Sequence, residues 1–559
     1  MNLDVQSLTL PVWAHKLREQ YLAGIASQFL LHSNINDLVP YQQEYYPLRK
    51  FLGFLLGKKE ILIFYNRSEG LTFAQPEMKD KFIRALNIAL GPLNPYQNSL
   101  PHEPSKVFPL IELVFSIHSC GVVIDYVETI VPAGEVSYMS GEDRNNLVTL
   151  RRWASSPQLL NADSVVILIT ENMSDVHPSL RNVTSRMNIL EIPFPGEPER
   201  LDYISWRMKK GSFVLEEISP ERLAALTSGL NRVHLEDVFS RAAYQSGKIT
   251  YDLVKESKKA IIENECSNLV EFVEPEHGFE IVGGCQAIKD ILLKTAKSVR
   301  EGRTRWVPMG ILFDGPPGTG KTFLGEAFAK ECGLNCLKLK NFREKWVGST
   351  ESNLEKILNV IKALAPVIVI VDEIDQSLGK RGGEGDSGTS NRIFAMLISF
   401  MGDTTHRGKI IFIGMCNRPD LLDEAFKRPG RFDLKIPFFY PDTKEEVLSL
   451  LKALVQKNGI SLSGEFLEKF SKRLIGYSGA EIEAILLQSA RYADDEGRSS
   501  IDEKDLEKGI GQFILNRDPM VRFMELISVK ECSFRDLLPV RYQSLSPDQI
   551  EDQIQSLGF

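Results

Sequence analysis

Short, continuous runs of apolar residues recur along this chain between stretches of mixed polarity. The clearest runs are Met309–Phe313, Val367–Val371 and Ile410–Ile413, and two similar runs occur in the first half, at 121–124 and 166–169. A fully apolar, β-branched run of this length suits a parallel strand that is buried on both faces. The pattern therefore predicts an α/β fold in both halves of the chain, with buried parallel strands and helices on their faces.

A glycine-rich loop follows the run at 309–313. It reads Gly315-Pro316-Pro317-Gly318-Thr319-Gly320-Lys321-Thr322, and a helical pattern follows at 323–329. Strand, glycine loop and helix in this order are the context of a phosphate cradle, in which backbone N–H groups and a helix N-terminus meet the phosphates. Lys321 would reach the β- and γ-phosphates, and the Thr322 hydroxyl would bind Mg²⁺. The loop predicts an ATP and Mg²⁺ site, and the alternative is a glycine-rich turn without a ligand.

Acidic residues follow the apolar run at 367–371, in the order Asp372, Glu373, Ile374 and Asp375. The carboxyl ends of the strands are where ligands bind in open α/β sheets. We expect Asp372 to hold Mg²⁺ through water and Glu373 to polarise the attacking water, the positioning that phosphoryl transfer requires. The alternative is a strand that is merely capped by acids.

The composition narrows the class of protein. The chain has 559 residues, which predicts several domains, and it is 43% apolar and 25% charged, as in ordinary soluble proteins. The net charge of −8 argues against a nucleic-acid partner. No apolar run approaches a membrane span, and the start shows no export signal, so we expect a cytoplasmic protein. The seven cysteines are scattered and predict free thiols, not a disulfide or zinc site.

The region after the run at 410–413 carries further motifs. Asn417 follows that strand, and Arg428-Pro429-Gly430-Arg431-Phe432-Asp433 comes soon after it. These blocks resemble the second region of homology of classical-clade AAA+ ATPases, the branch of katanin, spastin and the proteasome regulatory ATPases. The resemblance covers about residues 277–516. It implies that Asn417 orients the lytic water and that Arg428 and Arg431 are arginine fingers, which a neighbouring subunit can supply.

The same resemblance extends to three other segments. Residues 278–284 are similar to the strap that contacts adenine, through Ile281 and Val282, and residues 475–482 are similar to the sensor-2 turn of the helical lid, through Gly479 and Ala480. Residues 343–348 match a pore loop, with Trp346 and Val347 directed into a channel that grips extended polypeptide; the alternative for Trp346 is a core position. Residues 382–392 stand where a second pore loop would be. Their sequence resembles that of a bacterial and plastid subgroup of the family, whose members have a divergent N-terminal region.

The first half contains no phosphate loop, yet it resembles the second half at near-constant offsets of 245 to 247 residues. Asp125 stands opposite Asp372, Asn172 opposite Asn417, Arg186 opposite Arg431 and Gly229 opposite Gly476. Such offsets suggest a duplication, and the alternative is chance similarity between two α/β units. Tyr126 stands where Glu373 stands, and the expected first strand at 28–34 is followed by neither a glycine cradle nor a lysine. We therefore predict a first module without catalytic activity, whose Arg186 is a relic or an interface residue.

The predicted fold class is α/β with two tandem AAA-type modules, each a mostly parallel sheet with flanking helices and a small helical lid. The predicted boundaries are a degenerate first module at 1–262, a linker at 263–276, an ATPase core at 277–441, a lid at 442–516 and a tail at 517–559. Within the tail, Ser546 and Pro547 predict the start of a helix.

The resemblance implies an Mg-dependent ATPase that forms a homo-oligomeric ring, usually of six subunits. The first functional hypothesis is a remodeller that pulls a protein client, of unknown identity, through the pore. A second hypothesis is an ATP-gated assembly scaffold without translocation. A nucleic-acid motor is the least favoured, because the chain is acidic and shows no basic cluster with interleaved aromatic residues.

Overall fold

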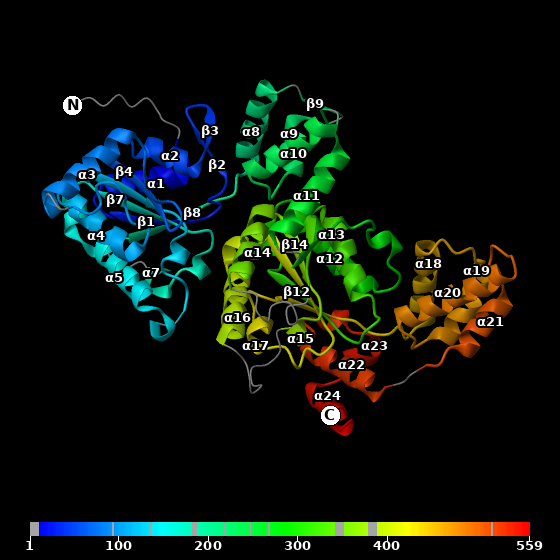
Figure 1. Cartoon of the computed structure of the whole chain (residues 1–559). Coiled ribbons are helices and arrows are strands. Elements are labelled where there is room, and N and C mark those ends of the chain that lie inside the picture. Colours follow the sequence, from blue (N-terminus) through cyan, green and yellow to red (C-terminus); the bar gives the residue numbers. More distant parts are fainter. Residues whose placement is uncertain are drawn as a thin grey trace. The chain divides into compact units, whose positions relative to one another are not determined.

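The computed structural model describes residues 10–91, 94–134, 136–181, 187–211, 213–216, 218–245, 247–266, 269–340, 351–377, 388–515 and 518–558. The chain divides into two compact units, Met1–Ile261 with Glu351–Ala363 and Ile262–Thr350 with Leu364–Phe559. Figure 1 shows the chain coloured from blue at its N-terminus to red at its C-terminus. Each unit is built around its own six-stranded sheet.

The sheet of the second unit has the order β11-β13-β14-β15-β12-β16. Only the edge strand β11 is antiparallel to its neighbour; the pairs along the rest of the sheet are parallel. The three central strands are buried at every residue, as their apolar runs predict. The strands are β11 (Val270–Val273), β12 (Gly310–Asp314), β13 (Asn335–Leu339), β14 (Val367–Val371), β15 (Ile410–Cys416) and β16 (Leu434–Pro437).

The sheet of the first unit has the order β5-β4-β6-β7-β1-β8, again with one antiparallel edge strand, β5. Its remaining pairs are parallel, so five strands follow the same path as those of the second sheet. The fold class predicted from the sequence is confirmed. The strands are β1 (Gln28–Ser33), β4 (Ile61–Asn66), β5 (Gly70–Phe73), β6 (Cys120–Ile124), β7 (Val165–Ile169) and β8 (Met187–Ile192).

Two backbone conformations repeat between the sheets. Tyr126 and Glu373, which stand opposite each other in the sequence comparison, both have a positive φ, of 55° and 47°. Gly229 and Gly476, at the turns into the helical domains, have φ values of 86° and 82°. Left-handed conformations are uncommon for residues other than glycine, so their recurrence at matched positions supports the predicted repeat.

Helices cover the first sheet and continue into a helical domain. Those beside the sheet are α1 (Val12–Leu22), α2 (Leu48–Leu55), α3 (Pro76–Leu90), α4 (Pro104–Phe115), α5 (Gly141–Ser155), α6 (Pro157–Asn161) and α7 (Pro178–Arg181). The helical domain comprises α8 (Glu197–Lys210), α9 (Pro220–Leu226), α10 (Arg232–Gln245) and α11 (Tyr251–Glu265), with the short strands β9 (Val214–Leu215) and β10 (Lys248–Ile249). A hairpin of β2 (Leu38–Tyr41) and β3 (Glu44–Pro47) follows β1 directly. The helix α14 (Glu351–Leu364) is grouped with this unit up to Ala363.

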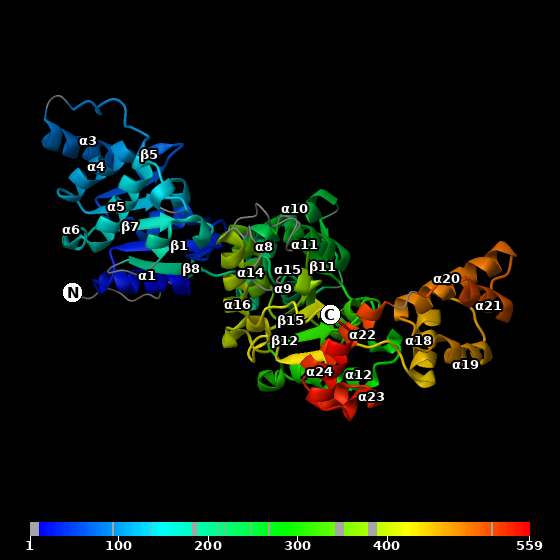
Figure 2. The same cartoon turned by 90° about the horizontal axis from the view of Figure 1, so that it is seen from below.

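The second unit has three groups of helices. Its core carries α12 (Gln286–Arg300), α13 (Lys321–Cys332), α15 (Ile374–Ser377), α16 (Gly388–Met401) and α17 (Glu424–Lys427). The lid consists of α18 (Lys444–Lys457), α19 (Gly464–Ser471), α20 (Gly479–Asp495) and α21 (Glu503–Gln512). The C-terminal segment forms α22 (Pro519–Glu531), α23 (Val540–Gln543) and α24 (Pro547–Ser556). Figure 2 shows these last helices, in red, apart from the orange lid helices.

Two expected segments differ from the structure. The expected linker at 263–276 contains the end of α11 and the strand β11, which pairs with β13. The expected tail at 517–559 is folded over its described residues, 518–558, because its apolar residues form a cluster with Phe439 of the core. The predicted helix start is confirmed, since the Ser546 hydroxyl accepts the Gln549 N–H and the Gln549 side chain accepts the Ser546 N–H.

Candidate nucleotide site

The backbone of the glycine loop requires its glycines. Gly315 has a φ of 128°, and a Cβ atom there would lie 2.2 Å from the carbonyl oxygen of Phe438. Gly320, with a φ of 86°, is the N-cap of α13, which begins at Lys321. The loop therefore leads directly from the end of β12 into a helix N-terminus, where unpaired N–H groups attract anions.

Lys321 joins the loop to the neighbouring strand. Its ammonium donates to the carbonyl oxygens of Gly315 and Pro316, both at 2.8 Å, and to Oδ1 of Asn417 at 2.9 Å. Burial lowers the pKa of Lys321 to about 8, against the opposing effect of the nearby Asp314 carboxylate. The structure thus brings together Lys321 and Asn417, two residues that are 96 positions apart.

The acids after β14 lie at the same edge of the sheet. Glu373 is exposed, and its N–H donates to Oδ1 of Asp372 at 3.0 Å. The other oxygen of Asp372 lies 3.1 Å from Nζ of Lys338. Glu373 has a left-handed backbone, with a φ of 47°, and it lines the cavity described below. Strained backbone of this kind clusters at functional sites.

Asp375 is a site residue that the sequence analysis did not assign. Its Oδ2 accepts the N–H groups of Asn417 at 3.3 Å and Arg418 at 2.9 Å, and the residue is buried. It therefore fixes the backbone that carries Asn417 against the acidic segment. Its position in the same acidic run as Asp372 was the available signal.

The lid meets the phosphate loop at Gly318. The Ala480 N–H donates to the Gly318 carbonyl at 3.2 Å, and the Tyr440 hydroxyl donates to the Pro317 carbonyl, also at 3.2 Å. A reciprocal capping box of Ser478 and Glu481 fixes the start of α20. The predicted lid residue Ala480 therefore lies at the loop, and Gly479 lies beside it.

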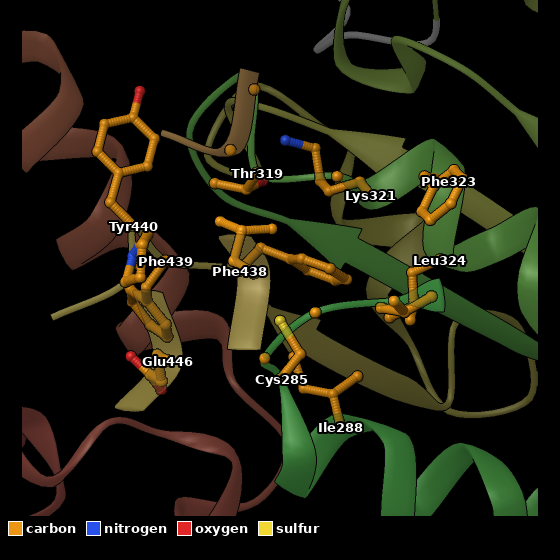
Figure 3. A pocket seen from close by; sticks show the side chains of 18 of the residues that line it. Cys285, Ile288, Thr319, Lys321, Phe323, Leu324, Phe438, Phe439, Tyr440 and Glu446 are labelled. Carbon is orange, nitrogen blue, oxygen red and sulfur yellow. The ribbon is translucent and has the colours of Figure 1, made fainter. Parts of the chain in front are cut away.

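A cavity of about 550 Å³ lies between the loop, the strap at 278–284 and the lid. Figure 3 shows Thr319 and Lys321 on one side of Phe438, and Cys285 and Ile288 on its other side. This volume is within the range of small-molecule sites. The predicted site residues that line it are Ile281, Val282, Pro317, Gly318, Thr319, Gly320, Lys321, Thr322, Asp372, Glu373, Asn417, Gly479 and Ala480. The C-terminal segment adds Leu537, Leu538 and Pro539 to the wall, which the sequence did not predict.

The donor set fits Mg²⁺ held together with phosphates. Thr322 and Asp372 both line the cavity and offer oxygen, the ligand that Mg²⁺ prefers. Within the part of the chain that the structure describes, no group of three or more His, Cys, Asp or Glu side chains could hold a metal ion. Such a small protein ligand set matches a metal that completes its coordination with substrate oxygens and water.

The other predicted residues lie elsewhere. Arg428 is exposed and Arg431 half-buried, with its guanidinium donating to the Ala425 carbonyl, and neither lines the cavity. Arg186, the pore-loop residues Trp346 and Val347, and residues 382–387 lie outside the described residues. The seven cysteines are free, as predicted. Among the helices that the structure describes, none is both long and apolar enough to cross a membrane.

Three stretches of the chain match protein-family models. Residues 6–193 match the AAA+ chaperone N-terminal Rossmann-like domain, and residues 198–267 match the AAA+ chaperone second helical domain. Residues 311–440 match the ATPase family associated with various cellular activities (AAA). Three successive stretches of the chain are therefore each similar to an AAA+ chaperone or AAA domain. The AAA match spans the phosphate loop, the acids, Asn417 and both arginines, and it implies nucleotide binding and ATP hydrolysis.

Two relatives are similar to part of this chain. A cell division cycle protein 48 homolog from Archaeoglobus fulgidus is 27% identical over 402 residues, which cover 66% of this chain and 54% of that protein. The peroxisomal ATPase PEX6 of Candida glabrata is 31% identical over 311 residues, which cover 52% of this chain and 31% of that protein. The chain therefore spans about half the length of the first relative and about a third of the second.

Proposed function

We propose that this chain binds Mg-ATP in the cavity of the second unit and uses its hydrolysis to remodel a protein client. The observation that carries the proposal is the junction of Lys321 with Asn417 beside Asp372 and Glu373, in a cavity whose lid touches the phosphate loop. The AAA+ chaperone matches support the remodelling role.

Each residue has a distinct part in the proposed reaction. Lys321 and the N-terminus of α13 stabilise the charge of the β- and γ-phosphates. Thr322 and Asp372 would hold Mg²⁺, which when bound would supply positive charge to the phosphate oxygens. Glu373 and Asn417 orient the attacking water in line with the leaving group. The lid contact at Gly318 excludes bulk water, which strengthens these interactions.

The hydrolytic site is completed by a neighbouring subunit in this proposal. Arg428 and Arg431 lie outside the cavity of their own chain, so they would serve as arginine fingers in the next one. A head-to-tail contact of this kind closes into a ring, and we propose six copies, a cytoplasmic location and the katanin and spastin branch of the family. Trp346 and Val347 would line the pore, and the first unit would be a structural or client-docking tier that binds no nucleotide.

A second candidate is an ATP-gated scaffold that orders a complex without moving a client. The contact of the lid with the loop favours it equally, because nucleotide binding alone would strengthen that contact. The two candidates separate at Trp346: a Trp346→Ala variant loses activity as a remodeller and keeps full function as a scaffold. A nucleic-acid motor remains the least favoured candidate for an acidic chain.

The test is affinity capture from the native host with a Glu373→Gln variant in the presence of Mg-ATP. The substitution keeps the shape of the side chain and removes the carboxylate, so hydrolysis should fall at least about 100-fold while ATP still binds. A protein retained with ATP and released without it supports the remodeller. Capture of nothing, or of the same proteins in both conditions, contradicts it. Glu496→Gln, an exposed acid beyond α20, is the matched control.

A further inference from the structure

The C-terminal helix α22 packs beside the edge strand β16, close to the segment that carries the two arginines. Lys427 ends α17 and directly precedes Arg428. Its side chain is only 4% exposed, which is unusual for an ammonium group. A buried ammonium requires carboxylate partners, and here one of them comes from α22.

That partner is Glu531, the last residue of α22. Its Oε1 lies 2.8 Å from Nζ of Lys427, and its Oε2 lies 3.1 Å from Nζ of Lys435. Lys435 belongs to β16, which pairs with the phosphate-loop strand β12. Ser533 reinforces the joint, since it exchanges hydrogen bonds with the Lys435 backbone at 2.8 and 3.1 Å. One carboxylate therefore ties the arginine segment to the sheet that holds the phosphate loop.

The charges support a fixed bridge. Burial opposes ionisation of Glu531, yet the two ammonium groups hold its pKa below the usual range. Burial also opposes the charge of Lys427, and its carboxylate partners Glu424 and Glu531 raise its pKa nevertheless. Glu424 is 69% exposed, so the buried side of Lys427 depends on Glu531. Removing that carboxylate would leave the ammonium buried with one exposed partner.

We propose that Glu531 is a positioning residue for the arginine fingers: it fixes Lys427, and through it Arg428, in the orientation that the neighbouring site requires. Glu531 does not line the nucleotide cavity, so its effect reaches the reaction through the arginine segment of its own chain. The inference rests on the proposed function, because it needs a site completed by a second copy. It makes the C-terminal segment part of the hydrolytic machinery of the ring.

The test uses rings in which only one kind of subunit can hydrolyse ATP. Full-length wild-type chains are mixed with an excess of Lys321→Ala chains, which offer their arginines to wild-type neighbours and have no working loop of their own. A second mixture uses Lys321→Ala/Glu531→Gln chains. Displacement of a catalytic group by about 1 Å can cost about 100-fold, so we expect kcat per wild-type site to fall at least about tenfold in the second mixture. KM for ATP should stay within about twofold, since the wild-type cavities are intact.

Two further mixtures serve as references. In the mixture with Lys321→Ala/Arg428→Ala chains, kcat per wild-type site should fall as much as with the Glu531→Gln chains, and KM for ATP should not change. Lys321→Ala/Glu551→Gln chains should match Lys321→Ala, because Glu551 pairs with Lys530 at an exposed site in the same segment. Native mass spectrometry establishes the subunit composition of each ring. If the Glu531→Gln chains do not enter rings, Lys427→Met replaces them, since it removes the buried ammonium and leaves Glu531 paired with Lys435, and the same loss is expected.

The outcomes separate the two proposals. Loss of kcat with Arg428→Ala but not with the Glu531→Gln or Lys427→Met chains overturns the positioning role and leaves the shared site standing. No loss with Arg428→Ala overturns the shared site, and the inference with it. A loss with Glu531→Gln that appears as a raised KM overturns the positioning role, because it would mean a distorted cavity in the neighbouring subunit.

Discussion

The two units differ most where the sheet meets the helical domain. In the first unit Asp37 fills this joint: its carboxylate accepts the N–H of Arg232 at 2.7 Å, the Arg232 guanidinium at 2.9 Å and the N–H of Val233 at 3.3 Å. Both members of this ion pair are buried. In the second unit the corresponding lid helix touches the phosphate loop through Ala480, and a cavity lies between them. In the first unit the Asp37 carboxylate therefore occupies the N-terminus of α10. In the second unit the corresponding place, beside the start of α20, is open for an anion to bind.

The hairpin of β2 and β3 strengthens this difference. It follows β1 at the place where the phosphate loop follows β12. Tyr45 of the hairpin packs on Tyr203 and Trp206 of α8, each at 4.9 Å between ring centroids, and Lys210 pairs with Glu44. Protein side chains therefore hold the first helical domain to its sheet. One sheet topology is therefore joined to its helical domain by side-chain contacts in the first unit and borders a cavity in the second, depending on the segment that comes after its first strand.

Breaking the Asp37 joint should have the largest effect on stability. Asp37→Asn keeps the shape of the side chain but leaves the buried Arg232 guanidinium without its counter-charge, which we expect to cost about 3 kcal/mol in the first unit. Hydrogen exchange of the full chain should show lost protection at the hairpin and at the start of α10. Glu216→Gln is the control, because its pair with Lys248 is exposed to solvent and should contribute little to stability. Unchanged protection would contradict a joint held by this ion pair.

Asp314 should make the stability of the second unit depend on pH. It ends β12, where β1 ends in Ser33, and burial raises its pKa to about 7. Neither of its carboxylate oxygens lies within normal hydrogen-bond geometry of a partner among the described residues, and the nearby Ser528 hydroxyl only partly offsets the effect of burial on the pKa. The folded state therefore binds a proton that the unfolded chain, with a pKa of about 3.9, releases, so stability falls as pH rises from about 4 to 7. Above pH 7 the buried carboxylate is ionised, and its full destabilising effect on the free energy of unfolding is present.

Asp314→Asn removes this dependence. We expect it to raise the free energy of unfolding of the second unit by about 2 kcal/mol at pH 8, and by less at pH 5, where the wild-type carboxyl is largely protonated. Thermal unfolding of the full chain at both pH values measures the difference. Asp548→Asn, at an exposed position of α24, should show no such change between pH 5 and 8. A gain that is equal at both pH values would contradict ionisation as the cause.

The sequence predicted those features of the two units that depend on a local pattern of residues. Apolar runs identified the buried strands, and the glycine loop and the acids after β14 identified the cavity edge. The edge strands were missed, because β5 and β11 pair antiparallel at the same place in their sheets but come from different points in the chain. Asp37 and Asp375 were also missed. Their roles depend on partners about 195 and 42 residues away, and no short motif records such contacts.

The C-terminal segment was hard to predict for a related reason. Its helices are short and weakly periodic, and they are stabilised by contacts with the core that the segment alone does not reveal. Leu538 and Tyr542 pack in one cluster with Phe439, which precedes the lid. The sequence predicted the helix at Ser546 from its cap but gave no sign that residues 537–539 reach the nucleotide cavity.

The smallest expected effect concerns the position that Tyr126 and Glu373 share. Both are left-handed, a conformation that costs about 1 kcal/mol for residues with a Cβ atom. In the second unit the proposed role of Glu373 explains why that cost is kept, whereas Tyr126 is 61% exposed and is given no catalytic role in the proposed reaction. Tyr126→Gly should therefore stabilise the first unit by about 0.5 kcal/mol, after the added flexibility of the unfolded chain is subtracted. Urea unfolding of the full chain measures this gain, and Val148→Gly, at an exposed position in the middle of α5, should instead destabilise by about 0.5 kcal/mol. Destabilisation by Tyr126→Gly would contradict this prediction, because it would mean that the Tyr126 side chain makes a contact that stabilises the first unit by more than the backbone strain costs.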